Sequence, residues 1–218
     1  MTTEIGQEKP LIQTMPSQNQ TPKQITPGFD LVLAVLLMSS TGCEWDCPLS
    51  SAKEATADPD LLGNWKAKYA ADFIKHIELN PNKHLQATFL LAIGSLKEVN
   101  YTPDSLPAGA MFVDAATQHQ FGNHADIICW PTRYKNASYL NYVNYDLATK
   151  KLGKHYTIAK YHCRGNSVTF FIPNKDVTKK MRKQLGANYN SNQLLEEFSN
   201  LKPEDWIIAL KCERIQSL

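Results

Sequence analysis

The stretch His155-Tyr-Thr-Ile-Ala-Lys-Tyr-His-Cys-Arg-Gly-Asn-Ser-Val-Thr-Phe-Phe-Ile172 decides the fold. Its first part, His155–Cys163, largely alternates in residue type, which is typical of a β-strand because successive side chains point to opposite faces. Arg164-Gly-Asn166 predicts a tight turn, and Val168–Ile172 predicts a returning strand. The stretch therefore predicts a β-hairpin within an antiparallel sheet.

Outside this hairpin, short apolar segments divided by turn residues predict further strands. They are Trp65–Tyr69, Phe73–Leu79, Leu85–Ile93, Ala110–Ala116, His124–Trp130 ending before Pro131, Ser138–Tyr145 and Trp206–Cys212. About nine short strands in one domain favour a mainly β (α+β) fold whose antiparallel sheet curls or closes into a barrel.

Two helices are predicted before the last strand. Lys175–Leu185 carries an apolar stripe at helical spacing, and Gly186 is a plausible stop. Ser191–Asn200 also has an apolar face, and Ser191 is its expected cap. A strand that follows two helices can pair with the first strand, which would close the barrel and remove its exposed edges.

The first predicted strand opens with Gly63-Asn-Trp65. A Gly-x-Trp at this place is typical of lipocalin-like barrels, in which the Trp plugs one end. The motif raises the hypothesis that the barrel carries a small apolar ligand. An interior filled by side chains would argue against that hypothesis.

The amino-terminal region is organised like a bacterial lipoprotein export signal. The apolar run Leu31–Met38 has the length of a signal core, and Ser39–Gly42 leads from it to Cys43. Cys43 is therefore the expected lipid attachment residue, and Cys47 is a less favoured alternative. The translation start is open between Met1 and Met15.

This interpretation divides the chain into three parts. Residues 1–42 are expected to be a disordered leader and signal, because they hold few aliphatic residues outside the apolar run. Residues 43–60 are rich in small and polar residues and are expected to form an extended tether. Residues 61–218 are expected to form a single β-rich domain.

The chain also resembles a family of uncharacterised bacterial lipoproteins, through motifs that occur in one order. They are Gly42-Cys43, Pro48-Leu49-Ser50, Leu61-Leu62-Gly63-Asn64-Trp65, Leu106-Pro107-Ala108-Gly109-Ala110-Met111, Pro131-Thr132, Tyr139-Leu140-Asn141 and Tyr156-Thr157-Ile158-Ala159-Lys160-Tyr161. The resemblance implies lipid attachment and no known activity. It implies a cell-envelope location, with the protein anchored on the periplasmic or outer face of a membrane.

Composition limits the possible partners. The chain has 218 residues, 43% of them hydrophobic, and a formal net charge of +2, so nothing in the bulk charge calls for nucleic acid. Besides Cys43, four cysteines permit one or two disulfides of undetermined pairing: Cys47, Cys129, Cys163 and Cys212. The expected partners are the membrane, through the lipid, and a small apolar ligand or an envelope protein.

No catalytic motif stands out, so a non-enzymatic role without cofactor or metal is expected. His119 and His124 lack the spacing of a helical metal site. His162 and Cys163 are adjacent on a strand and would point to opposite faces, which disfavours a thiol–imidazole pair. An extracytoplasmic enzyme remains the weaker alternative, and it would need a cleft with clustered titratable groups.

Two groups of side chains carry further hypotheses. A basic run could contact anionic lipid headgroups or form a solvated helix face: Lys175, Lys179, Lys180, Arg182 and Lys183. A tyrosine group could line a ligand-binding surface or serve as strand packing: Tyr134, Tyr139, Tyr142, Tyr145, Tyr156 and Tyr161.

Overall fold

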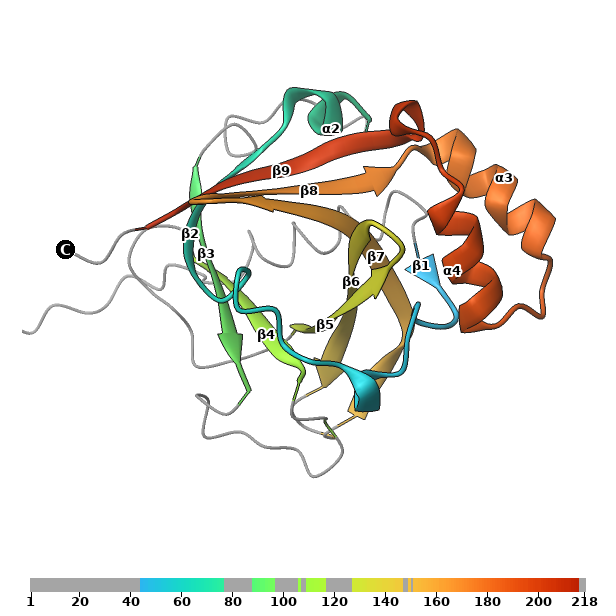
Figure 1. Cartoon of the computed structure of the whole chain (residues 1–218), viewed down its shortest axis with the longest axis horizontal. Helices are drawn as coiled ribbons and strands as arrows, with labels where there is room; N and C mark the ends of the chain where they lie inside the picture. Colours follow the sequence, from blue (N-terminus) through green and yellow to red (C-terminus); the bar gives the residue numbers. More distant parts are fainter. Residues whose placement is uncertain are drawn as a thin grey trace, which may run out of the picture.

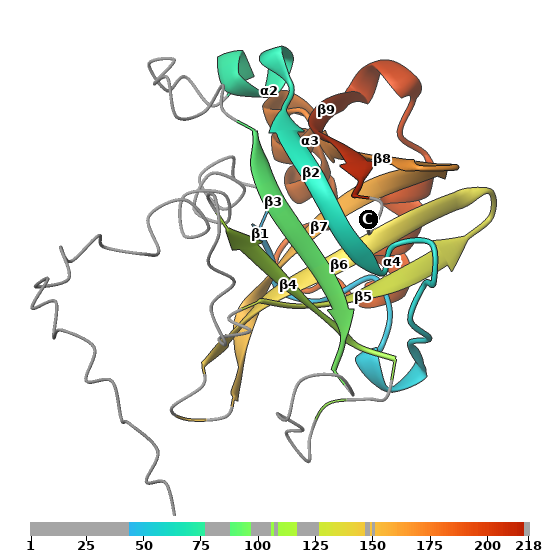
Figure 2. The same cartoon turned by 90° about the vertical axis from the view of Figure 1, so that its left-hand side faces the viewer.

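The computed structural model describes residues 44–76, 88–96, 106, 109–116, 127–146, 149 and 151–215. The described residues form a closed antiparallel β-barrel with one extra strand (Figures 1 and 2). The strands are β1 (Glu44–Trp45), β2 (Gly63–Tyr69), β3 (Phe89–Ser95), β4 (Met111–Ala116), β5 (Ile127–Tyr134), β6 (Ala137–Asp146), β7 (Lys151–Arg164), β8 (Ser167–Pro173) and β9 (Trp206–Arg214). The helices are η1 (Ala52–Glu54), α2 (Ala71–His76), α3 (Lys175–Leu185), α4 (Ser191–Ser199) and η3 (Pro203–Asp205). The predicted mainly β class is confirmed.

The barrel closes through its last strand, as predicted. Each strand from β2 to β9 pairs antiparallel with the next, and β9 returns to pair with β2. In this closing pair Trp65 lies opposite Arg214, and Tyr69 lies opposite Leu210. The extra strand β1 pairs with β7 beside β8, with Glu44 opposite Thr157.

Side chains of β2 alternate between the two faces of the sheet. Trp65, Ala67 and Tyr69 are buried, whereas Lys66 and Lys68 are exposed. The inward residues join a buried cluster that every strand of the barrel supplies: β2 to β9 each contribute at least one residue. A second buried cluster lies between the outer face of the barrel and the helices α3 and α4.

Several elements occur where local signals predict them. The turn between β7 and β8 contains Gly165 at φ 54°, a conformation that glycine adopts without a Cβ clash. Helix α3 has the predicted bounds, and Gly186 caps it at φ 70°. Its N-terminus is capped by Asn174, whose side chain accepts a hydrogen bond from the Val177 N–H at 2.9 Å.

Two predicted strands and one cap differ in the structure. Phe73 lies in helix α2 instead of a strand over 73–79, and its ring stacks on Tyr69 at 5.6 Å. Strand β5 continues past Pro131, because β4 pairs with it only as far as Cys129 and the missing N–H loses no ladder bond there. Helix α4 is capped by Asn190 and not by Ser191.

The expected tether is wrong for residues 44–60, which pack against the barrel (Figure 1). Trp45 is 0% exposed and Leu49 is 2% exposed. The Leu49 N–H donates to Asn141 Oδ1 at 2.7 Å, and Trp130 Nε1 donates to the Ser50 carbonyl at 3.1 Å. The many small residues suggested a spacer, but two large apolar side chains and these buried hydrogen bonds fix the segment.

Residues 1–43 lie outside the described part of the chain, and Cys43 is among them. Within the described part, no helix has both the length and the apolar character needed to cross a membrane.

Candidate functional site

The residues directly before β2 close one end of the barrel around Trp65. The indole Nε1 donates to the Leu61 carbonyl at 2.9 Å. The Arg214 guanidinium lies over the indole ring, with Cζ 4.2 Å from the ring centroid. The same guanidinium donates to the carbonyls of Leu62 at 2.6 Å and Asp60 at 2.8 Å. It therefore joins the last strand, β9, to the segment that precedes β2.

Gly63 makes this closure possible. Its φ of +131° is unfavourable for residues with a Cβ. A Cβ at this position would also stand 2.6 Å from Arg214 Nη1. The backbone conformation at this position therefore requires glycine, and the Arg214 guanidinium occupies the space beside it.

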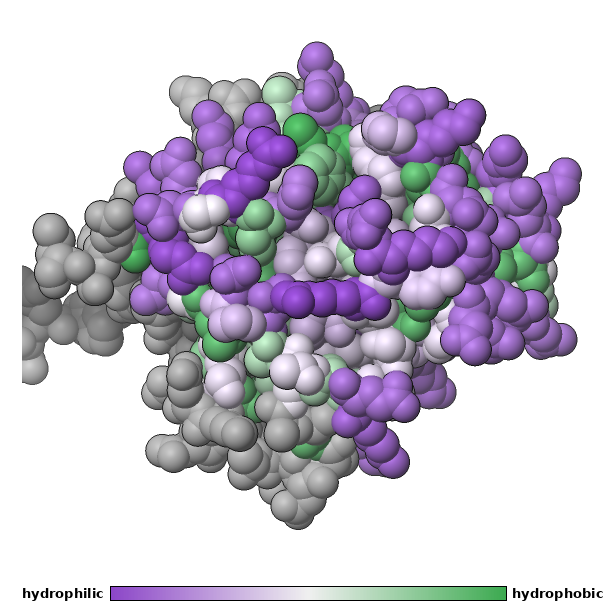
Figure 3. Space-filling view, in the orientation of Figure 1, coloured by the Kyte–Doolittle hydropathy of each residue, from purple (hydrophilic) through white to green (hydrophobic). Residues whose placement is uncertain are grey.

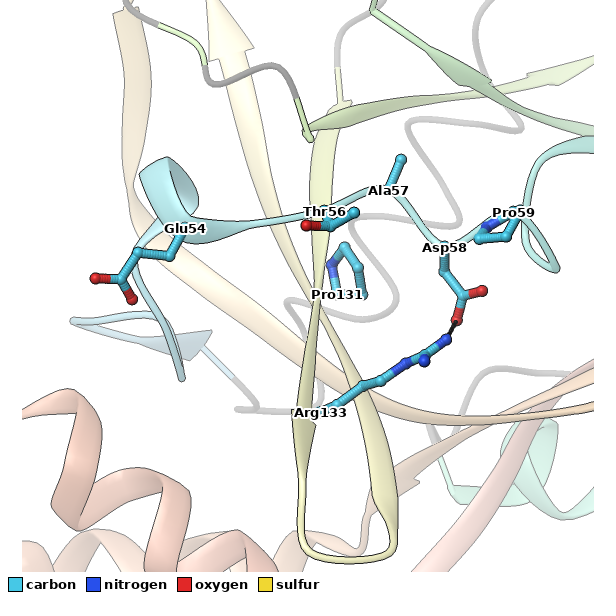
Figure 4. A pocket seen from close by; sticks show the side chains of 7 residues that line it. All are labelled: Glu54, Thr56, Ala57, Asp58, Pro59, Pro131 and Arg133. Atoms are coloured by element: carbon cyan, nitrogen blue, oxygen red, sulfur yellow. Dashed lines mark hydrogen bonds and ion pairs between the residues drawn. The ribbon is translucent and has the colours of Figure 1, made fainter.

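The buried carboxylate of Asp58 gathers partners from two strands, and Figure 4 shows its ion pair with Arg133. Tyr161 of β7 donates its hydroxyl to Asp58 Oδ2 at 2.6 Å. Arg133 of β5 approaches the same oxygen at 3.0 Å. The Asp60 N–H donates to the other oxygen at 3.1 Å.

These contacts change the acidity of both buried groups. Burial alone would raise the pKa of Asp58, but hydrogen bonds from Tyr161, Arg133 and Asp60 outweigh it and lower that pKa. Burial and the neighbouring carboxylate raise the pKa of Tyr161. Asp58 is therefore held as an anion and Tyr161 as a neutral donor.

Asp58 and Arg133 also line a surface pocket of about 320 Å³. Figure 4 shows its lining: Glu54, Thr56, Ala57, Asp58, Pro59, Pro131 and Arg133. Its central cation and anion neutralise each other, since Arg133 is directed at Asp58. The pocket thus presents polar edges but no unpaired buried charge for chemistry.

The barrel interior is apolar and contains thiols. Cys129 and Cys212 are buried there, and Cys163 is half-buried against the same cluster. Burial raises the pKa of Cys163 to about 11 and that of Cys212 to about 12, so both stay protonated near neutral pH. Cys163 and Cys212 face Val168 from its two sides, a spacing of about 10 Å that a disulfide cannot span.

Not all inward residues are sealed from solvent. Phe89, Tyr142 and Ile207 pack against the interior cluster but remain partly accessible. Burial raises the pKa of the Tyr142 hydroxyl well above its usual value. The interior is thus closed around Trp65, and solvent reaches part of these three side chains.

The other predicted residues are scattered. His119 and His124 lie outside the described residues, and no metal-ligating group of three occurs within the described ones. His162 is exposed while Cys163 faces the interior, so the two do not form a pair. All four cysteines that the structure describes are free.

The tyrosine group does not form one surface. Tyr142 and Tyr161 lie with the interior cluster, and Tyr139 lies under the helices against Phe198. Tyr145 and Tyr156 belong to a third cluster on the outer face. These tyrosines mainly serve as strand packing.

The basic run occupies the exposed face of α3 next to β1. Lys179, Lys180, Arg182 and Lys183 are exposed. Arg182 donates to the Glu44 carbonyl and lies over the Trp45 ring, with Cζ 5.4 Å from the centroid. The helix therefore adjoins the first described residue.

Comparison with protein-family models, curated proteins and solved structures finds no match to this chain. The functional interpretation therefore rests on the residues and their geometry.

Proposed function

We propose that this chain is a lipid-anchored protein of the bacterial cell envelope, whose mature form begins at Cys43. In this proposal the barrel acts outside the cytoplasm in binding or in envelope structure, without catalysing a reaction. The lipid on Cys43 holds the domain at the membrane surface.

The observation that carries the proposal is the place of β1 in the fold. Cleavage before Cys43 would leave every described element in the mature chain. Cleavage before Cys47 would remove Trp45, whose ring makes edge contacts with Phe198 at 5.5 Å and Tyr189 at 6.2 Å. The fold therefore supports Cys43 over Cys47 as the mature start.

The state of the titratable groups supports a non-catalytic role. Asp58 is bound by Tyr161 and Arg133, and the interior thiols are held protonated by burial. An acid, base or nucleophile needs a pKa near the working pH and access to a substrate. The groups that the structure gathers meet neither requirement.

Acyl labelling in living cells tests the anchor. Cells expressing the full chain are fed a fatty acid with a detectable tag, and the purified protein is assayed for the tag. The proposal expects label on the wild type and on Cys47→Ser, and none on Cys43→Ser. Equal labelling of Cys43→Ser, or no label on the wild type, would contradict it.

A carrier of a small apolar ligand is the second candidate. It is favoured by the partly accessible inward side chains Phe89, Tyr142 and Ile207 in an otherwise apolar interior. The end sealed by Trp65 and Arg214 would be the floor of such a site.

An apolar fluorescent probe, N-phenyl-1-naphthylamine, tests the carrier hypothesis. Ile207→Trp adds volume inside the barrel, whereas Ile208→Trp adds it on the outer face, where Ile208 pairs with Phe171. A carrier predicts saturable binding that Ile207→Trp weakens and Ile208→Trp leaves unchanged. No saturable binding, or equal effects of both variants, would exclude it.

A further inference from the structure

The exposed lysines of α3 form a basic face, defined here as Lys179, Lys180 and Lys183. None of the three has an ion-pair partner among the ion pairs of the described part of the chain. Unpaired positive charges on one helix face are available to an external anion. In Figure 3 hydrophilic side chains cover much of the visible surface, including the end of the molecule that carries α3 and α4.

The helix that carries the basic face contacts Glu44, the residue that follows the proposed attachment residue. Arg182 contacts the Glu44 carbonyl from the same helix, and Met181 packs in one cluster with Trp45. Cys43 directly precedes Glu44, and consecutive Cα atoms are about 3.8 Å apart. Because residues 44–60 pack on the barrel, no spacer separates the attachment residue from α3.

Nearby acidic groups are partly engaged elsewhere. Glu196 of α4 accepts hydrogen bonds from Tyr134 at 2.9 Å and Lys135 at 3.1 Å. Asp46 faces His155 at 3.4 Å and accepts from Tyr189 at 3.5 Å. Asp176 is exposed on α3, one turn before Lys179 and Lys180. Apart from the Lys135–Glu196 pair, the charges on and beside α3 are five positive and three negative, an excess of two: Lys175, Lys179, Lys180, Arg182 and Lys183 against Glu44, Asp46 and Asp176.

We propose that the basic face of α3 binds anionic lipid headgroups and sets the orientation of the barrel on the membrane. The inference deepens the proposed function, because the lipid on Cys43 would bring α3 to the bilayer. The two acyl chains of a diacylglycerol group on Cys43 would anchor the protein stably, so the basic face would fix its orientation and not its attachment. Each lysine near an anionic surface strengthens binding by about fivefold.

A membrane fits this face better than nucleic acid. The net charge of the whole chain is only +2, so the positive charge is local and not spread along a groove. Helix α3 is also held flat against the barrel by Met181 and Thr178, which suits a planar surface. The contact of α3 with Glu44 therefore favours a role for this face in orienting the protein on a membrane.

Vesicle sedimentation tests the proposal without the lipid anchor. The full chain with Cys43→Ser is mixed with vesicles of phosphatidylcholine alone, or with phosphatidylglycerol added, at low and high salt. The test variant adds Lys179→Gln, Lys180→Gln and Lys183→Gln. The matched control removes the same charge from the exposed outer face of β2 and β9, through Lys66→Gln, Lys68→Gln and Lys211→Gln.

The proposal expects the parent chain to bind only the vesicles that contain phosphatidylglycerol. High salt should weaken this binding, and the α3 variant should bind at least about thirtyfold more weakly than the parent. The control should bind as the parent does. Equal losses in both variants would show nonspecific attraction and overturn the proposal. Binding to duplex DNA with the same α3 dependence, and none to vesicles, would also overturn it.

The outcome is separable from that of the anchor test. Acyl labelling reports on Cys43, whereas sedimentation of the Cys43→Ser chain reports on α3 alone. Circular dichroism of each variant shows that the fold is retained. A labelled chain whose α3 variant binds vesicles normally would keep the anchor and refute the orientation.

Discussion

Asp58 is one of the residues that tie the segment before β2 to the barrel wall. Its carboxylate is 4% exposed and receives hydrogen bonds from Tyr161 and Arg133 on two different strands. A buried carboxylate is stable only with such partners, because losing water costs several kcal/mol. The contact therefore holds the closed end of the barrel together.

Replacing Tyr161 with Phe should lower the free energy of unfolding by about 2 kcal/mol, because it removes a hydrogen bond to a buried charge. Tyr134→Phe is the matched control, since the Tyr134 hydroxyl bonds to Glu196 at an exposed site. We expect the control to be close to neutral, because solvent screens an exposed contact. Urea unfolding at neutral pH measures both, and equal losses would contradict the role given to Asp58.

The lowered pKa of Asp58 makes part of the stability depend on pH. The folded-state pKa lies below the unfolded value of about 3.9, so the contribution is complete above that value and is lost as pH falls through the folded pKa. The difference in unfolding free energy between wild type and Asp58→Asn should be constant near neutral pH and shrink in acid. A difference that does not change from neutral pH to about pH 2 would show that Asp58 carries no such linkage.

Sequence patterns reached some of these residues and missed others. Trp65 was predicted as an end plug because Gly-x-Trp is a local motif. Asp58 lies 103 residues from Tyr161 and 75 from Arg133, and no local pattern joins residues so far apart. Arg214 was missed for the same reason, since its register opposite Trp65 exists only after the barrel closes.

Elements show the same division between local and distant causes. The β7–β8 hairpin and α3 were predicted well because alternation, a turn glycine and an apolar stripe are written within each segment. Helix α2 was predicted as a strand because Phe73 and its neighbours are apolar in a short run. In the structure Phe73 is buried from a helix and its ring stacks on Tyr69, an arrangement that a run of apolar residues does not distinguish from a strand.

Strand β1 gives an element-scale prediction. Trp45→Ala should cost about 3–5 kcal/mol of unfolding free energy, because a fully buried indole is removed from the cluster under α3 and α4. Lys53→Ala, at an exposed position in the same segment, should be nearly neutral. Guanidinium unfolding, fitted with a fixed m-value, measures the loss of unfolding free energy in each variant. A small loss for Trp45→Ala would mean that residues 44–60 are a loose tether.

At the scale of the whole molecule, the closed barrel explains why the last strand follows two helices. Strand β9 fills the gap between β8 and β2, so neither β2 nor β8 is left with a bare edge. Closure was predictable because the number and length of strands favour it. The packing of residues 44–60 along the outside was not, since it depends on buried contacts with Asn141 and Trp130.

This packing changes what a lipid on Cys43 would do. A tethered domain would move freely above the bilayer, whereas a domain that starts at Glu44 would lie on the surface with α3 beside the anchor. The lipid on Cys43 would then determine both the membrane location and the orientation of the domain.

The mass of the mature protein from the membrane fraction reports on the cleavage site and the lipid together. If Cys43 is the lipid attachment residue, the mature chain begins at Cys43 and carries the added mass of a diacylglycerol group on that residue. Globomycin, an inhibitor of lipoprotein signal cleavage, should also make the uncleaved precursor accumulate. A mature chain that begins elsewhere and carries no acyl mass would contradict the account.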